Sequence, residues 1–413
     1  METIHVSADF TAAIGKIKPM HSVNNGPASL RGSSNADYFA DAAIPFARTH
    51  DANFAPQYGA PHTVDIISIF PDFDADENDP ASYDFHLTDE YMEKIMSTGA
   101  QVFYRLGNKI EHESKRYGAL PPKDFHKWAR ICEHIIRHMK EGWADGNHYG
   151  MTYWEIWNEP DLHPQCWDGP NELFFELYEI AARHLKACFP DLKIGGPAVT
   201  SVNNKGFLIA FFDYITRDKE NPVPMDFFSF HRYTTTPEDL AKHADEARRL
   251  CDEYGYTEAE TILNEWNYVK NWHPREDMLY SYRTIPSLKG SAFILSCMIA
   301  CQHSTLDHLM YYDARINTGW NGLALSTGGV CGMIAEPDLS PLAGTDVIRI
   351  SMGEDYGISF VLKTWVKPGQ ERLWCSVETV CGFVVTDADR VAPLTFANTS
   401  DAGTGAAVDP SGD

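Results

Sequence analysis

Long apolar runs are missing from this sequence: nowhere do roughly 18 uncharged apolar residues follow one another, as a membrane-spanning helix requires. The N-terminus also lacks the basic residues and following apolar run that mark a secretory leader. The sequence therefore shows no signal for membrane insertion or for secretion. A cytoplasmic protein is therefore expected, unless a leader has been removed by processing.

Basic side chains are also in short supply. The 34 lysines and arginines face 58 aspartates and glutamates, which gives a formal net charge of −24. A surface of this sign repels the phosphates of nucleic acids and of anionic membranes. Neither nucleic acid nor a membrane is expected as a partner, whereas a neutral or cationic small substrate is compatible with the charge. The sequence does not indicate an oligomeric state.

Metal and cofactor motifs are missing as well. The nine cysteines contain no C-x-x-C pair, and neither an H-E-x-x-H motif nor a glycine-rich phosphate loop occurs. Asp72, Asp74 and Asp76 have the spacing of a calcium loop, but Glu77 stands where the turn requires glycine, which favours a solvated acidic loop. Reduced thiols, no metal and no cofactor are therefore expected.

Aromatic residues, in contrast, are abundant: they make up 12% of the chain and include ten tryptophans. Two interpretations stay open. The rings can fill a large hydrophobic core, as most tryptophans do, or they can stack on the apolar face of a sugar ring. Composition alone does not decide between them.

Short runs rich in Ile, Val, Phe and Tyr alternate with longer amphipathic stretches over residues 14–312. This alternation indicates βα units around a parallel sheet. Eight strands with intervening helices over this length predict an α/β fold of the (β/α)8 TIM-barrel type. The eight predicted strands are Lys16–Ser22, Ile44–Thr49, Gln101–Leu106, Tyr153–Trp157, Leu192–Gly195, Phe227–His231, Thr261–Glu265 and His308–Tyr312.

Amphipathic stretches between these strands predict helices. Pro122 and Pro237 lie near two of the predicted helix starts, where the missing N–H of proline is tolerated. The run after the second strand is irregular, and no helix is assigned to it. The six predicted helices are Thr88–Thr98, Pro122–Glu141, Pro170–Phe189, Lys205–Thr216, Pro237–Tyr254 and Thr284–Gln302.

The composition changes beyond Gly322, where Gly, Ser, Thr and Ala become frequent. The predicted organisation is a catalytic barrel at residues 1–322, a small β appendage at 323–397 and a flexible tail at 398–413. Short strands are expected in the appendage at Ile358–Val366, Glu371–Val377 and Gly382–Thr386.

Two predicted strands end in closely similar motifs. The fourth ends in W-N-E-P at residues 157–160, and the seventh ends in N-E-W-N at residues 264–267. In each motif a glutamate lies beside asparagine and tryptophan. On a parallel barrel these glutamates, Glu159 and Glu265, are expected at the C-terminal rim, where the catalytic groups of this fold lie.

Glycosidic bond cleavage requires one carboxylic acid that protonates the leaving oxygen and a second carboxylate that attacks the sugar or activates water. Glu159 and Glu265 meet this requirement. Asn158 adds an amide donor for a sugar hydroxyl, and the indoles of Trp157 and Trp266 are expected to wall the site. A single N-E-P is ordinary turn chemistry, so the interpretation depends on finding both motifs on strands four and seven.

The two motifs also carry a resemblance. The sequence is similar to glycoside hydrolase family 39, which comprises β-xylosidases and α-L-iduronidases and belongs to a superfamily with catalytic glutamates on strands four and seven. The resemblance covers about 300 residues. It is carried by W-E-I-W-N-E-P-D-L at 154–162, K-I-G-G-P-A at 193–198, D-F-F-S-F-H-R-Y at 226–233 and N-E-W-N at 264–267.

What the resemblance implies is a retaining mechanism, with Glu265 as nucleophile and Glu159 as general acid/base. The carboxyl groups should then lie about 5 to 5.5 Å apart, whereas the residues alone leave retention and inversion open. By the same resemblance, the hydroxyl next to the anomeric carbon is expected to be contacted by Asn158, and the rest of the sugar by His231, Tyr233 and His50.

The region after strand eight departs from the family. Its xylosidases usually carry an aromatic pair that ends in tryptophan there, but this chain reads Y-Y-D-A-R at residues 311–315. Tyr312 and Trp320 are the predicted sugar contacts of this region, although Trp320 is equally suited to simple packing. Xylose specificity therefore stays open.

The sequence predicts a retaining, exo-acting glycosidase that resembles β-xylosidases and acts on oligosaccharides from plant polysaccharides. The first alternative is the same mechanism on another glycoside, such as an α-L-arabinoside, a uronide or a different β-glycoside. A uronide requires basic residues near the pocket, for which Arg48, Arg105 and Arg232 are the evident candidates. The second alternative is a non-catalytic carbohydrate-binding barrel.

Overall fold

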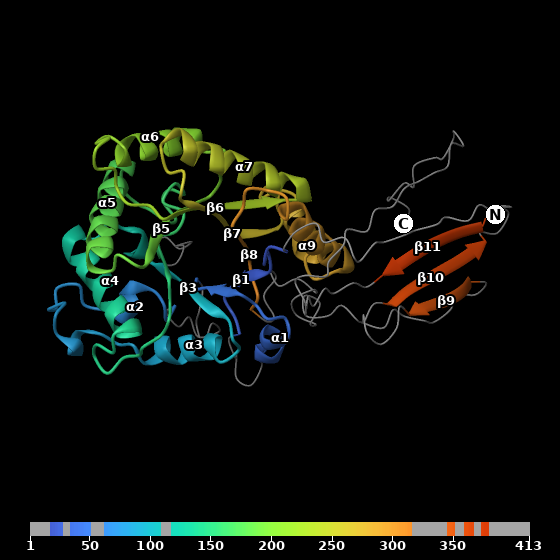
Figure 1. The fold of residues 1–413 in the computed structure, drawn as a ribbon, viewed down its shortest axis with the longest axis horizontal. Helices are drawn as coiled ribbons and strands as arrows, with labels where there is room; N and C mark the ends of the chain where they lie inside the picture. Colours follow the sequence, from blue (N-terminus) through green and yellow to red (C-terminus); the bar gives the residue numbers. More distant parts are fainter. Residues whose placement is uncertain are drawn as a thin grey trace. The chain divides into compact units, whose positions relative to one another are not determined.

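The computed structural model of the 413-residue chain is shown in Figure 1. The structure describes residues 17–27, 34–50, 62–108, 117–315, 345–351, 359–366 and 373–379.

Eight parallel strands form a closed barrel in the order of the sequence, β1 to β8. Helices surround the strands on the outside (Figure 1). The predicted (β/α)8 TIM barrel is therefore confirmed. The strands are β1 (Ser22–Asn24), β2 (Phe46–Arg48), β3 (Gln101–Leu106), β4 (Tyr153–Ile156), β5 (Lys193–Val199), β6 (Phe227–Thr234), β7 (Glu260–Tyr268) and β8 (His308–Tyr311).

The barrel closes where its first strand meets its last. In β1, Ser22 pairs with Met310 and Val23 pairs with Tyr311 of β8. The first predicted strand, Lys16–Ser22, is wrong, since β1 begins only where that prediction ends. Local composition favoured the earlier residues, but the position of β1 is set by its hydrogen bonds to β2 and β8.

Five of the six predicted helices occur with their ends displaced by at most three residues. The exception is Thr284–Gln302, because a separate helix ends at Thr284 and the next begins only after Pro286 and the cap residue Ser287. Three short helices had not been predicted: α1 (Ala36–Asp41), α2 (Ile66–Ile69) and α8 (Arg275–Thr284). The others are α3 (His86–Met96), α4 (Phe125–Lys140), α5 (Asn171–Cys188), α6 (Lys205–Ile215), α7 (Pro237–Glu253) and α9 (Leu288–Cys301).

Helix α4 illustrates how the sequence sets these elements. The Asp124 carboxylate accepts a hydrogen bond from the backbone N–H of Lys127 at 3.0 Å, which caps the helix and places its start after Pro122. Trp128, Ile131 and Ile135 recur at helical spacing and are buried. The helix therefore turns one apolar face toward the strands and leaves the other in water.

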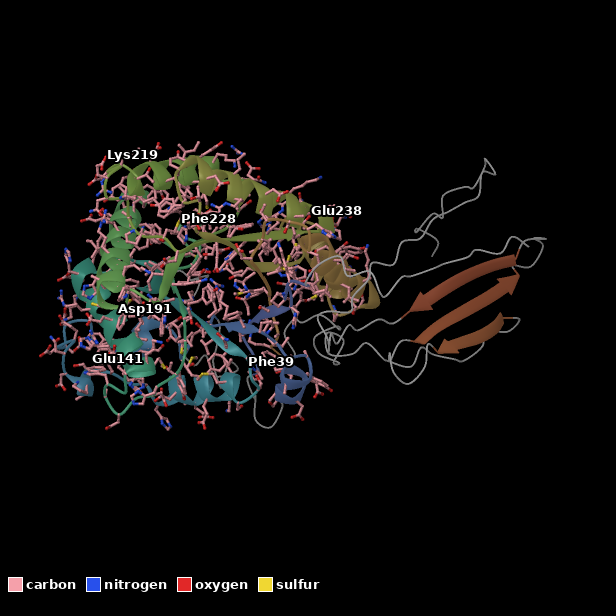
Figure 2. All side chains as sticks on the ribbon, viewed as in Figure 1. Phe39, Glu141, Asp191, Lys219, Phe228 and Glu238 are labelled. Atoms are coloured by element: carbon pink, nitrogen blue, oxygen red, sulfur yellow. The ribbon has the colours of Figure 1, made fainter. Side chains whose placement is uncertain are left out.

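Side chains sort by polarity across the fold (Figure 2). The labelled Phe228 lies in the interior and is fully buried, while the labelled charges Glu141, Asp191, Lys219 and Glu238 lie at the surface. Inside the barrel, an apolar layer is formed by Phe103, Tyr153, Phe227, Ile262 and Met310.

Above this apolar layer, toward the C-terminal ends of the strands, the barrel interior becomes polar. Two positions further along their strands stand Arg105, Glu155 and Asn264, all fully buried. Because side chains two apart on a strand point to the same side, these polar groups follow the inward row. The polar layer supports the rim where the predicted catalytic residues lie.

A separate three-stranded antiparallel sheet has the order β11-β10-β9, formed by Thr345–Ser351 (β9), Ser359–Val366 (β10) and Leu373–Thr379 (β11). The predicted strand Ile358–Val366 matches β10, Glu371–Val377 overlaps β11, and β9 had not been predicted. The predicted strand Gly382–Thr386 and the predicted tail 398–413 lie outside the described residues. The boundaries 1–322, 323–397 and 398–413 stay predictions.

Among the described helices, none is by itself long and apolar enough to cross a membrane. The bent pair of α8 and α9 passes the same test on length and composition alone.

Candidate active site

Glu159 and Glu265 meet at the C-terminal end of the barrel. Glu159 lies in the loop after β4, and Glu265 lies in the upper half of β7. One carboxylate oxygen of each, together with a ring nitrogen of His231, lies within 4.8 Å of the others. The convergence that the two motifs predicted is therefore present, at a spacing close to that of a retaining carboxylate pair.

The backbone around Glu159 is held in an unusual conformation. Trp157, Glu159 and Ala198 have positive φ angles of 72°, 46° and 55°, which side-chain-bearing residues rarely adopt. The N–H of Glu159 donates to the carbonyl of Ala198 at 2.9 Å, and the indole of Trp157 donates to the carbonyl of Cys166 at 2.9 Å. These bonds fix the left-handed turn that aims the Glu159 carboxylate at β7.

His231 lies between the two carboxylates. Its Nδ1 is 2.7 Å from Glu159 Oε1 and 3.4 Å from Glu265 Oε2. The register of β6 against β7 shifts between Phe230 and His231, so that His231 pairs with Glu265 rather than with Asn264. This irregularity brings the imidazole level with the carboxylates.

Glu265 is surrounded by donors. Arg48 Nη1 donates to Oε1 at 2.9 Å, His50 Nε2 lies 3.2 Å from Oε1, and the Tyr233 hydroxyl donates to Oε2 at 2.9 Å. Burial alone would raise the pKa of Glu265, but the charges of His231, His50 and Arg48 and the Tyr233 hydrogen bond outweigh it. The pKa of Glu265 therefore lies below its ordinary value, which favours the carboxylate.

Arg48 is the hub of the polar layer. Its Nε donates to Glu155 Oε2 at 2.7 Å, its Nη2 donates to Asn158 Oδ1 at 2.7 Å, and its Nη1 also donates to Asn24 Oδ1 at 2.9 Å. Burial lowers the pKa of Arg48, but the charges of Glu155 and Glu265 raise it by more than burial lowers it. The pKa of Arg48 is therefore above its ordinary value, and the guanidinium stays charged. It joins side chains from β1, β2, β4 and β7.

Sequence reasoning missed Glu155, Asn264 and Asn24 as parts of this site. Asn264 donates to the Glu155 carboxylate, and the Asn24 amide donates to the carbonyl of Asn264 at 2.6 Å. A signal was available, since Glu155 is a charged residue in the middle of an otherwise apolar strand, two positions after the inward-facing Tyr153.

Glu159 has more open surroundings than Glu265, with 12% of its side chain exposed against 6%. Cys166 Sγ lies 3.8 Å from Glu159 Oε2. Burial, and next the charge of Glu159, raise the pKa of the Cys166 thiol, which therefore stays protonated beside the carboxylate.

Aromatic rings line one side of the site. Tyr312 stands edge-on to His50 with 5.7 Å between ring centroids, and to Tyr233 at 6.5 Å. The Asn267 amide donates to the carbonyl of Tyr312 and so ties the end of β8 to β7. The predicted contacts His50, Tyr233 and Tyr312 are thus brought together, whereas Trp320 lies outside the described residues.

The prediction that the indoles of Trp157 and Trp266 wall the site is wrong. Trp157 and Trp266 are 1% and 0% exposed. Trp157 packs against Trp128 and Trp167, and Trp266 packs against Tyr311. The register of β7 shifts against β6 and β8 at this point, so Glu265 points inward like Asn264 before it. Trp266 then points to the opposite side, into the core between the barrel and its helices.

The three arginines considered for a uronide are all engaged within the protein. Arg48 is bound as described above, and Arg105 Nη2 lies 2.6 Å from the Asp65 carboxylate, both fully buried. Arg232 Nε donates to Asp239 at 2.7 Å. Each of the three is thus already paired with a carboxylate of the protein.

Two clusters within the described part of the chain have donor atoms close enough to share a metal ion. One is Glu159 with His231 and Glu265. The other is Glu133 with His184 and Cys188 on the outer helices α4 and α5, where Arg137 and His184 already bind the Glu133 carboxylate. The second cluster is therefore explained as an ion pair between helices.

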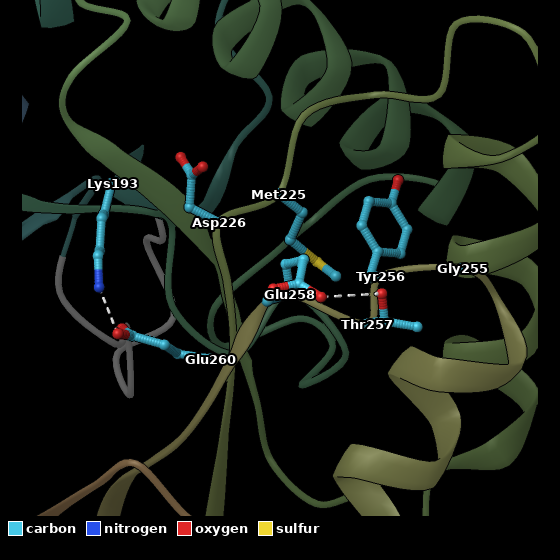
Figure 3. Close-up of a pocket in the computed structure, with 9 residues that line it drawn as sticks. Lys193, Met225, Asp226, Gly255, Tyr256, Thr257, Glu258 and Glu260 are labelled. Carbon is cyan, nitrogen blue, oxygen red and sulfur yellow. Dashed lines mark hydrogen bonds and ion pairs between the residues drawn. The ribbon is translucent and has the colours of Figure 1, made fainter.

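A pocket of about 290 Å³ lies at the opposite, N-terminal end of the barrel. Figure 3 shows Lys193 paired with Glu260 at one side of it, with Met225 and Tyr256 further to the right. Lys193 and Glu260 are the first residues of their strands, whereas Glu265 lies near the other end of β7. This end of a barrel serves stability rather than chemistry.

The closed barrel and the facing glutamates at the ends of β4 and β7 define a class, that of the glycoside hydrolase barrels. Within that class, the chain belongs to Glycosyl hydrolases family 39, whose model matches residues 5–272.

Two curated relatives are named Beta-xylosidase. That of Geobacillus stearothermophilus is 30% identical over 248 residues, which cover 58% of this chain and 41% of the relative. That of Caldicellulosiruptor saccharolyticus is 32% identical over 152 residues, 37% of this chain and 27% of the relative. The matched region thus spans less than half the length of either relative.

Among solved structures, a glucosidase from Croceicoccus marinus has a TM-score of 0.65 and 26% identity, with 89% of this chain and 80% of that chain covered. A monomeric beta-xylosidase from Caulobacter crescentus has a TM-score of 0.57 and 15% identity, with 89% and 78% covered. The second likeness shows the fold alone.

Proposed function

We propose that the protein is a retaining glycoside hydrolase with β-xylosidase-like activity, acting from the end of a carbohydrate chain. The observation that carries this proposal is the approach of a Glu159 oxygen and a Glu265 oxygen to within 4.8 Å. Retaining enzymes place their carboxyl groups about 5 to 5.5 Å apart, because one of them must reach the anomeric carbon directly. Family membership and the two β-xylosidase relatives support the substrate class.

The surroundings of the two glutamates assign their roles. Glu265 accepts bonds from Arg48 and Tyr233, and its lowered pKa keeps it ionised as a nucleophile must be. Glu159 is the more exposed carboxyl and lies opposite, where a leaving group can reach it. It is the general acid and base.

In the first step, Glu265 attacks the anomeric carbon while Glu159 gives its proton to the leaving oxygen. The bond to the leaving group breaks, and a glycosyl ester forms on Glu265. In the second step, Glu159 takes a proton from water, whose oxygen attacks the anomeric carbon and releases Glu265. Two inversions at one carbon give a product with the configuration of the substrate.

Asn158 is oriented to hold the sugar. Arg48 donates to its Oδ1 at 2.7 Å, which fixes which end of the amide is the oxygen. The amide NH2 is then the group left to donate to the hydroxyl beside the anomeric carbon. His50 and Tyr312 stand edge to face at the same rim and form one wall of the sugar site.

The test is substitution of each glutamate. Glu265→Ala and Glu159→Ala should each lower turnover by roughly a hundredfold to ten-thousandfold or more, on the usual contribution of a catalytic carboxyl group. Azide should partly restore the Glu159→Ala variant on activated substrates. Exposed Glu258 at the other end of the barrel provides the matched control Glu258→Ala. Near-native activity in either active-site variant would overturn the proposal.

A second candidate is a glucosidase, because the Croceicoccus marinus structure, at 26% identity, carries that name. Glucose differs from xylose only by the hydroxymethyl group on C5. Aryl β-xylosides, β-glucosides, α-L-arabinosides and uronides compared by kcat/KM decide between the substrates. A uronide is disfavoured, since Arg48, Arg105 and Arg232 are each held by a protein carboxylate. Binding without hydrolysis of any of them would indicate a non-catalytic barrel.

A further inference from the structure

Trp272 differs from the other tryptophans of the barrel. Of the tryptophans whose side chains the structure describes, Trp128, Trp154, Trp157, Trp167 and Trp266 are at most 2% exposed and Trp143 is partly buried, while Trp272 is 49% exposed. Covering this ring with a ligand would remove apolar area from water, which is favourable.

The position of Trp272 relates it to the active site. Its ring stands edge-on to Tyr233, with 5.1 Å between ring centroids and 74° between the planes. The hydroxyl of the same Tyr233 donates to Glu265 Oε2 at 2.9 Å. Trp272 is therefore separated from the proposed nucleophile by one tyrosine side chain.

The rings form a continuous arc. From His50 the contacts run to Tyr312 at 5.7 Å, from Tyr312 to Tyr233 at 6.5 Å and from Tyr233 to Trp272 at 5.1 Å. The arc begins at a group that touches Glu265 and ends at a ring that is half exposed to solvent. Such a sequence of rings follows the course that a sugar chain takes out of a rim pocket.

The segment that carries Trp272 is anchored on its N-terminal side. Before it, the N–H of Val269 donates to the carbonyl of Thr234 at 3.2 Å, and the N–H of Lys270 donates to Ser281 Oγ at 2.9 Å. Lys270 Nζ also lies 2.8 Å from Asp277 of α8. The indole is presented from a fixed loop, which limits the entropy lost when a ligand covers it.

We infer that Trp272 is the stacking platform of a second saccharide subsite, which takes the sugar unit next to the one held between Glu159 and Glu265. An indole face packs on the apolar face of a pyranose without selecting its hydroxyls. This subsite rests on the proposed function and adds to it a preference for oligosaccharides over substrates with a small leaving group.

The experiment compares two substrates in Trp272→Ala. The first is a xylo-oligosaccharide, which fills both subsites, and the second is a glycosyl fluoride, whose leaving group has no ring to stack. On the energies of aromatic stacking, kcat/KM for the oligosaccharide should fall about tenfold, mainly through KM, with less than about a twofold change for the fluoride. Trp272→Phe should recover most of the loss.

The matched control is Leu279→Ala, which removes an apolar side chain of α8 that is 41% exposed and lies outside the arc. It should leave both substrates unaffected. Unchanged oligosaccharide kinetics in Trp272→Ala would overturn the inference, and so would an equal loss on both substrates, which would indicate a structural role.

Calorimetric binding of a thio-linked oligosaccharide, which is not hydrolysed, separates this inference from the proposed function. If the unaltered protein hydrolyses neither substrate but Trp272→Ala weakens this binding about tenfold, the proposed function fails and the subsite stands. If hydrolysis is normal and binding is unchanged by the substitution, the proposed function stands and the subsite fails.

Discussion

Arg48 shows how much of this site depends on a residue that does not touch the proposed scissile bond. Its guanidinium is fully buried and lies against the carboxylates of Glu155 and Glu265. Removing one member of such a buried group of charges is destabilising, because the remaining charges have lost their hydration and no longer have a partner to compensate for it.

We therefore expect Arg48→Met to destabilise the protein by about 3 to 5 kcal/mol, since it leaves buried carboxylates without their counter-charge. The double variant with Glu155→Gln should recover part of this loss. The control is Arg232→Met in the half-exposed pair with Asp239, where the loss should stay at or below about 1 kcal/mol. Chemical denaturation followed by fluorescence measures all three, and equal losses for Arg48→Met and Arg232→Met would contradict the interpretation.

Tyr233→Phe should change the pH dependence of catalysis. The pKa of Glu265 is lowered in part by the Tyr233 hydroxyl, so removing this donor raises that pKa toward the value that burial favours. The nucleophile is then protonated at a higher pH, and the acid limb of kcat/KM should move to higher pH, as expected for the loss of a hydrogen bond to the charged form.

Tyr254→Phe is the control for this pH profile, because the Tyr254 hydroxyl donates to Asp213 of the outer helix α6 rather than to a carboxylate of the site. Its acid limb should coincide with that of the unaltered protein. A profile of Tyr233→Phe that is merely lower, with the same acid limb, would show that the hydroxyl does not act through Glu265.

At the scale of single residues, the sequence predicted the two glutamates because both motifs carry their chemistry in a few adjacent letters. It missed Glu155 and Asn264, since only the alternation along a strand tells which side chains enter the barrel. The expected roles of Trp157 and Trp266 were wrong because both are adjacent to site residues in sequence and yet buried away from them, Trp266 on the other side of β7 and Trp157 in the left-handed turn after β4.

At the scale of elements, the long strands and amphipathic helices were predictable, whereas their ends depend on distant partners. β1 has only three residues, and its position is fixed by pairing with Met310 and Tyr311 of β8, which is distant in sequence but adjacent in the barrel. The predicted helix Thr284–Gln302 began too early, because Pro286 cannot continue α8 and Ser287 caps α9 at the backbone N–H of Gly290.

Gly195 in β5 provides a test of packing between strands. A methyl group there would overlap the carbonyl oxygen and ring of Phe227 in β6, so Gly195→Ala should destabilise the barrel by about 1 to 3 kcal/mol, as overpacking does. Gly206 in α6 has no atom within 4 Å of the added carbon, so Gly206→Ala should instead stabilise by about 0.5 to 1 kcal/mol. Thermal unfolding distinguishes the signs, and a neutral Gly195→Ala would show that β5 and β6 can move apart.

At the scale of the whole molecule, the sequence predicted the barrel and two strands of the antiparallel sheet, but it missed β9. Eight repeated βα units leave a pattern that survives errors in any one of them. The antiparallel β9, β10 and β11 have no such repetition, and β9 lies in a stretch whose composition does not distinguish strand from loop.

A xylose-shaped iminosugar should stabilise the whole barrel by binding the folded state alone. At about one hundred times its Kd, the free energy of unfolding should rise by about 2.7 kcal/mol, with a Tm higher by several degrees. The cationic ring is drawn to the carboxylates of Glu159 and Glu265. The double variant with alanine at both positions should lose most of this shift, and an identical shift in both proteins would mean that the ligand binds elsewhere.

The hydrogen bonds of Asn24 have one more consequence. Its amide reaches the carbonyls of Asn264 and Met310, and its Oδ1 holds Arg48, which in turn holds Glu265. The position of the nucleophile Glu265 thus depends on the pairing of the first strand of the barrel, β1, with the last, β8. In a refolding chain whose strands β1 and β8 have not yet paired, the other strands can be in place while Glu265 still lacks this support. Recovery of enzymatic turnover would therefore report the closure of the barrel rather than the formation of the other strands.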